Sequence, residues 1–89
     1  MSNYYVYMKK GYYITSEDKK VILEPQNIID VSNSNIIELV IPRGCKILYC
    51  WNNQLTELVV PNGCENIYCD YIPSIIDNTN GECEIKMYL

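Results

Sequence analysis

The chain has 89 residues, of which 48% are hydrophobic, and its seven basic and eleven acidic side chains give a net charge of −4. This length corresponds to one domain, and the acidic balance lacks the positive field on which nucleic-acid binding depends. No segment approaches the roughly 18 consecutive apolar residues of a membrane-spanning helix, and the first residues do not form a signal peptide. We therefore expect a non-secreted, cytoplasmic protein that binds neither nucleic acid nor membranes.

The first part of the chain, residues 1–16, is predicted to form a β-hairpin. Two runs that favour strands flank Lys9-Lys10-Gly11 within the segment 4–14, and glycine suits the positive-φ position of a hairpin turn. Tyrosines dominate both runs and combine an apolar ring with a polar hydroxyl. We expect this hairpin to cap the structure formed by the rest of the chain.

The remainder, residues 17–89, is predicted to be a solenoid because it repeats itself. The segment 37–45 (IELVIPRGC) recurs as 56–64 (TELVVPNGC), which is an offset of 19 residues, and the same offset relates 47–50 (ILYC) to 66–69 (NIYC). A short fixed period is typical of stacked coils, each of which buries its apolar face against its neighbours. Extending the period in both directions gives about four coils of 18–19 residues, the outer two degenerate.

The pattern within the most complete unit favours strands. Leu48 and Cys50 alternate with Tyr49 and Trp51, so the first pair faces inward and the second faces outward. Asn53 follows this strand, and its amide is suited to satisfy backbone groups where the chain bends. Nineteen residues hold two short strands and two bends, which leaves little room for a helix. We therefore predict a mostly β fold.

Recurring turns and a terminal strand complete the predicted coil. Pro42-Arg43-Gly44 and Pro61-Asn62-Gly63 mark the same corner twice, because proline fixes φ and glycine accepts positive φ. Asn80-Gly81 repeats this corner, with Thr79 in the place of proline. The segment 85–89 should form a strand whose outer edge invites pairing with another copy. We accordingly expect a homodimer or a larger homo-oligomer.

The five cysteines follow the same repeat. Equivalent positions in stacked coils form columns, so we expect buried free thiols that act as small apolar side chains. Disulfides are a second interpretation, and a tetrahedral zinc site formed by Cys45, Cys50, Cys64 and Cys69 is a third. Cys83 departs from the 18-residue alignment of the last coil and is expected to be more exposed. The leading interpretation requires no metal and no other cofactor.

One face of the predicted sheet is the candidate binding surface. Aromatic and charged side chains occupy outward positions of neighbouring strands, a combination that suits the recognition of a partner. The same side chains could instead stabilise the sheet through cross-strand contacts, or form a contact between identical subunits. The candidate partner-binding residues are Tyr49, Trp51, Tyr68, Asp70, Lys86 and Tyr88.

The sequence offers no support for catalysis. It contains no histidine and no glycine-rich phosphate loop, and its serines have no identifiable base nearby. Glu38 and Glu57 are periodic equivalents and are interpreted as a solvated row. We therefore expect a protein that is not an enzyme.

The segment 48–58 (LYCWNNQLTEL) resembles the leucine-rich repeat, because leucine or cysteine and one asparagine stand at the spacing of that motif. The resemblance covers roughly residues 17–89, although only this unit has the whole motif: at offsets of 19 residues Asn53 is matched by Ser34 and Ile72. Similar short repeat proteins, rich in asparagine and isoleucine, occur in large DNA viruses of amoebae and in AT-rich protists. The resemblance thus implies host interaction or virion association, in the host cytoplasm or the virion.

Together these observations predict a non-enzymatic module for protein interaction or structural assembly that binds a protein partner, most readily itself. The alternative function is that of a cysteine-based zinc-binding module.

Overall fold

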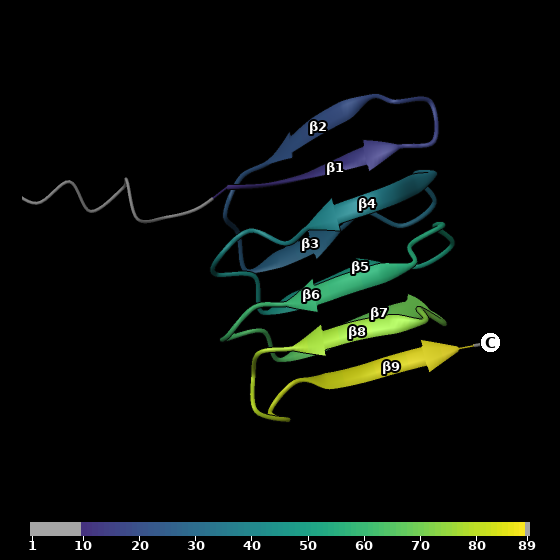
Figure 1. The fold of residues 1–89 in the computed structure, drawn as a ribbon. Coiled ribbons are helices and arrows are strands. Elements are labelled where there is room, and N and C mark those ends of the chain that lie inside the picture. The colour runs from purple at the N-terminus through teal and green to yellow at the C-terminus, as the bar shows by residue number, and fades with distance from the viewer. Residues whose placement is uncertain (1–9, 89) are drawn as a thin grey trace, which may run out of the picture.

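The computed structural model describes residues 10–88, and every regular element in this part of the chain is a β-strand (Figure 1). The predicted mostly β fold is therefore confirmed. The strands are β1 (Gly11–Thr15), β2 (Lys20–Leu23), β3 (Ile28–Asp30), β4 (Ile36–Val40), β5 (Ile47–Cys50), β6 (Glu57–Val60), β7 (Asn66–Asp70), β8 (Ser74–Asp77) and β9 (Glu84–Tyr88).

The strands β3 to β9 form a parallel β-solenoid of about three turns. One wall is a continuous parallel sheet in the order β3-β5-β7-β9, and the opposite wall contains the parallel pair β6-β8. Ile28, Ile47, Asn66 and Glu84 stand in register across the continuous sheet, at successive separations of 19, 19 and 18 residues. The period read from the sequence is thus the register of the sheet.

The first predicted coil does not stack as the others do. β2, which the period places next to β4, is separated from it by β1, and β1 pairs with both neighbours in antiparallel fashion. Tyr12, for example, stands opposite Ile22 on one side and Val40 on the other. The solenoid therefore has about three turns rather than four, because an antiparallel strand occupies the place where a further parallel pair would form.

The hairpin predicted for the first residues differs from the one in the structure. Its first strand lies outside the described residues, whereas Gly11, its predicted turn residue, is the first residue of β1 and is absent from the glycines with positive φ. The turn that joins β1 to β2 instead contains Asp18 with a φ of 66°. Gly11 is required by close approach, because a Cβ there would lie 2.1 Å from the carbonyl oxygen of Val40. The division of domains at residue 16 stays a prediction.

The core lies between the two walls and consists of side chains that alternate along the strands. Ile36, Leu48, Leu58 and Ile67 are at most 1% exposed and come from four successive strands of the solenoid. Each coil adds one layer to this core, so a coil gains most of its stability from its neighbours.

The predicted corners are confirmed and explain how the walls are joined. Gly44, Gly63 and Gly81 have φ values of 89°, 95° and 83°, which favour glycine over any other residue. Thr79 replaces proline in the last corner, and its hydroxyl oxygen accepts a hydrogen bond from the amide of Cys83 at 3.0 Å. The same hydroxyl donates to the Asp77 carboxylate at 2.6 Å. A side chain thus organises the corner that lacks proline.

The predicted role of Asn53 is also confirmed. Its Oδ1 accepts hydrogen bonds from the backbone amides of Ser34 and Ile36 in the preceding coil, at 3.1 and 3.0 Å. Its Nδ2 donates to the carbonyl of Val31 at 2.9 Å and lies 3.2 Å from the carbonyls of Cys50 and Trp51. One side chain therefore joins two successive bends.

Candidate functional site: two outer faces of the solenoid

The predicted binding residues lie together on the outer face of the continuous sheet. Tyr49, Tyr68 and Lys86 are in register on β5, β7 and β9 and form the first row. The two tyrosine rings are stacked, with centroids 4.9 Å apart and an angle of 11° between their planes. Lys86 Nζ lies 5.0 Å from the centroid of the Tyr68 ring, so a cation extends the aromatic row.

A second row runs beside the first at the ends of the same strands. The rings of Trp51 and Tyr88 meet with centroids 4.8 Å apart. Asp70 stands in register with Tyr88, and its carboxylate accepts a hydrogen bond from the amide of Asn52 at 2.7 Å. Asp70 therefore fixes the bend after β5. The structure brings all six predicted residues to one face, and their role in binding a partner stays a prediction.

The two rows differ in how much surface they leave free. Tyr49 and Tyr68 are half-buried because they cover each other, and such a cross-strand pair stabilises a sheet by about 0.2–1 kcal/mol. Tyr88 is 56% exposed and Met87 is 41% exposed, both on the terminal strand β9. Free apolar surface on this wall is thus concentrated at β9, which has no neighbour on its outer edge among residues 10–88.

All five cysteines are free and buried, as the leading interpretation expected. Cys45, Cys64 and Cys83 occupy equivalent corners of successive coils, and Cys50 stands in register with Cys69. The prediction that Cys83 is more exposed was wrong, because it is only 8% exposed. The residue missing from the last coil follows Cys83, so this thiol keeps its separation of 19 residues from Cys64.

The four cysteines considered as zinc ligands lie in two separate places. Cys45 precedes β5 and Cys50 ends it, and a strand of this length spans about 10 Å. Zinc–sulfur bonds of about 2.3 Å require four sulfurs around one point. Within the described part of the chain, no group of three or more histidine, cysteine or acidic side chains is arranged to hold a metal ion.

The thiols are held in their protonated form. A hydrogen bond with the neighbouring Cys69 and burial raise the pKa of Cys50, and a hydrogen bond with Cys64 and burial do the same for Cys45. Burial raises the pKa of Cys83 to about 12. Reactive or metal-binding cysteines require thiolates, so these residues act as parts of the core.

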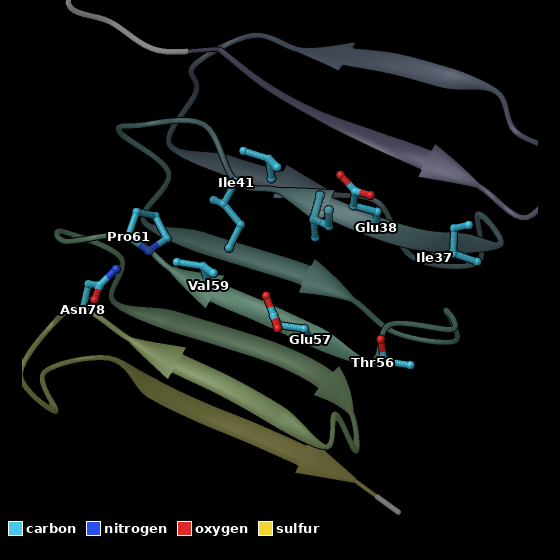
Figure 2. A pocket seen from close by; sticks show the side chains of 10 residues that line it. Ile37, Glu38, Ile41, Thr56, Glu57, Val59, Pro61 and Asn78 are labelled. Carbon is cyan, nitrogen blue, oxygen red and sulfur yellow. The ribbon is translucent and has the colours of Figure 1, made fainter.

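The opposite wall has a groove that the sequence did not predict. It lies between β4 and β6, has a volume of about 630 Å³, and is shown with its lining side chains in Figure 2. Glu38 and Glu57, interpreted above as a solvated row, lie on its two sides and are exposed. Glu38 also accepts a hydrogen bond from the Tyr12 hydroxyl at 2.9 Å, and this bond raises the pKa of the Tyr12 phenol. The sequence showed the glutamates but not the separation of their strands.

Comparison with known proteins leaves the chain without an assigned relative: no protein-family model, no curated protein and no solved structure matches it. The described residues also include no helix that is long and apolar enough to cross a membrane.

Proposed function

We propose that this protein is a non-enzymatic interaction and assembly module that associates with a second copy of itself. The observation that supports the proposal most strongly is the free edge of β9 beside the exposed aromatic surface. An unpaired edge presents a row of backbone donors and acceptors to another strand. A twofold arrangement would let one patch serve both copies.

The backbone of β9 specifies which residues take part. Glu84 donates its amide to Glu65 of the preceding coil, and Tyr88 accepts from Tyr71, so alternate residues of β9 face the solenoid. Ile85 and Met87 consequently direct their N–H and C=O groups to the free edge. They are the residues through which a second copy would pair.

Charge selects one register for this pairing. If β9 pairs with itself in antiparallel fashion around Ile85, Glu84 of one copy stands opposite Lys86 of the other. Opposite charges in that position stabilise a sheet, whereas centring on Lys86 would oppose two lysines. Within one chain these side chains already form an ion pair at 3.7 Å, so their charged groups are on the same face of β9.

The native mass of the purified protein tests this proposal. Sedimentation equilibrium in reducing buffer, with and without chelator, is expected to give a dimer that ignores the chelator. Lys86→Glu should weaken the dimer by placing Glu opposite Glu, and the double variant Glu84→Lys/Lys86→Glu should restore it. Met87→Pro removes an edge donor that the fold does not use and should give monomers with an unchanged circular dichroism spectrum.

Three results would reject the proposal. One is a wild-type protein that stays monomeric at 100-fold dilution steps up to its solubility. Another is a dimer that Met87→Pro does not change. The third is a single charge variant and a double variant that dimerise equally well.

The finer identity of the repeat belongs to the same proposal. We infer that the coils are of the leucine-rich-repeat type, and the support is Asn53, which bonds to the bend of the preceding coil as the resemblance implies. Association with host proteins or virions would follow from that identity. The binding surface for such partners would be the aromatic face described above.

A further inference from the structure

The groove between β4 and β6 results from a break in the outer wall of the solenoid. The two strands are neighbours by the repeat, yet they form no strand pair, whereas β6 and β8 pair along their length. One hydrogen bond, from the amide of Gln54 to the carbonyl of Ile36 at 2.8 Å, joins the two coils at the start of these strands. Beyond that point the strands separate and the groove opens (Figure 2).

The antiparallel strand β1 accounts for the separation. β4 pairs with β1 on its other edge, and the register shifts between Ile14 and Thr15, which leaves Ile37 as an extra residue in β4. Such a bulge bends the strand and increases its twist. β4 therefore follows the antiparallel sheet rather than the solenoid.

The backbone of β6 presents unused hydrogen-bonding groups to the groove. The carbonyls of Thr56 and Val60 accept hydrogen bonds from Ser74 and Asn78 at 3.2 and 3.0 Å, so these residues face β8. Because the direction alternates along a strand, Glu57 and Val59 direct their N–H and C=O groups toward β4. No backbone hydrogen bond to either residue from β4 occurs among residues 10–88.

The side chains around the groove are apolar and acidic. Ile37, Val40 and Val59 are 45%, 40% and 42% exposed, which is high for aliphatic side chains. The carboxylates of Glu38 and Glu57 lie on opposite sides of the groove and form no ion pair with any cation between Lys10 and Tyr88. Two like charges on adjacent strands disfavour each other, and a cation placed between them would relieve this repulsion.

We propose that this groove binds an extended peptide segment of a partner protein, in which a lysine or arginine lies between aliphatic residues. The peptide adds to β6 as a strand and uses the free backbone groups of Glu57 and Val59. Its basic side chain lies between the two glutamates, and its aliphatic side chains cover the exposed valines. This site is on the wall opposite the aromatic face and does not depend on self-association.

A synthetic peptide provides the direct test. The probe is an acetylated and amidated heptapeptide, Thr-Val-Lys-Val-Val-Val-Thr, which carries fluorescein on an added linker and is followed by fluorescence anisotropy. A second peptide has glutamate in place of lysine, and a third has alternate backbone amides methylated. We expect the first to bind, and both others to bind at least about tenfold more weakly, which corresponds to about 1.4 kcal/mol.

Variants of the full chain locate the site. Glu57→Gln should weaken binding of the lysine peptide about three- to fivefold and the double variant Glu38→Gln/Glu57→Gln about tenfold, in the range expected for exposed ion pairs. Glu82→Gln is the matched control, because Glu82 is an exposed carboxylate on the turn before β9, away from the groove. Its affinity for the peptide should equal that of the wild type.

Several outcomes would overturn the proposal. They include no binding of the lysine peptide at 1 mM, equal binding of the glutamate peptide, and unchanged affinity in the double glutamine variant. Weak binding by the wild type with a gain of tenfold or more in Val6→Pro would assign the groove to the chain's own first residues. An affinity that falls as protein concentration rises would assign it to a second copy.

Discussion

Asn53 provides the sharpest test of how the coils are held together. Alanine at this position removes both acceptor bonds to the amides of Ser34 and Ile36 and the donor bonds to the carbonyls. Ile36 is fully buried, so water cannot replace the lost partner of its amide. An unsatisfied buried donor costs about 1–3 kcal/mol, and two of them give an expected loss of about 4 kcal/mol.

This loss is a large share of the total free energy of unfolding, which is about 4–13 kcal/mol for a chain of this length. The assay is urea unfolding in reducing buffer, followed by the fluorescence of Trp51, the only tryptophan in the chain. With an m value of about 1.3 kcal/mol/M, the midpoint of Asn53→Ala should fall by about 3 M. Asn53→Asp keeps the acceptor and should fall between the alanine variant and the wild type.

The neighbouring Gln54 supplies the control. Its side chain is exposed, and only its backbone amide takes part in a hydrogen bond between coils. Gln54→Ala should therefore stay within about 0.5 kcal/mol of the wild type. A midpoint for Asn53→Ala within about 0.5 M of the wild type would refute the reasoning, because the amide would then contribute little to the stacking of coils.

Three further predictions concern the first sheet, the last corner and the thiols. Gly11→Ala should lower the free energy of unfolding by about 3 kcal/mol, since its Cβ would meet backbone atoms of β4, whereas Gly63→Ala has open space and should cost about 1 kcal/mol for its positive φ alone; equal urea midpoints would contradict this. Thr79→Val should cost about 2 kcal/mol because the amide of Cys83 loses its acceptor, and an unchanged melting temperature would exclude that role. Because the pKa of Cys83 rises to about 12 in the fold and thiols of unfolded chains ionise near about pH 8.5, stability should be unaffected below pH 8 and decline from about pH 8.5 toward pH 12; Cys83→Ala should reduce the slope, and a stability that rises over this range in the wild type would be inconsistent with buried neutral thiols.

The repeat allowed the solenoid to be predicted from local information. The offset between Ile47 and Asn66 is both a property of the sequence and the register of two strands. Pro-x-Gly corners and the amide of Asn53 could also be predicted, because each depends on a few neighbouring residues and on simple conformational rules.

What could not be predicted is which strands pair across long separations. β1, β2 and β4 all favour strands, and nothing in their residues indicates that β1 lies between the other two. The groove depends on that choice and on a bulge at Ile37, so the sequence alone gave no sign of it. Likewise, Cys83 was misplaced because an alignment by period does not say where within a coil a residue is missing.

The unequal walls of the solenoid have a consequence for how the molecule changes shape. The sheet β3-β5-β7-β9 is uninterrupted, whereas the opposite wall is joined between β4 and β6 only near Ile36. Bending along this seam would open or narrow the outer wall while the continuous sheet serves as a hinge, and it would break few hydrogen bonds. Amide hydrogens that face the seam, such as those of Glu57 and Val59, should then exchange with solvent much faster than those of Leu58 and Val60 on the same strand.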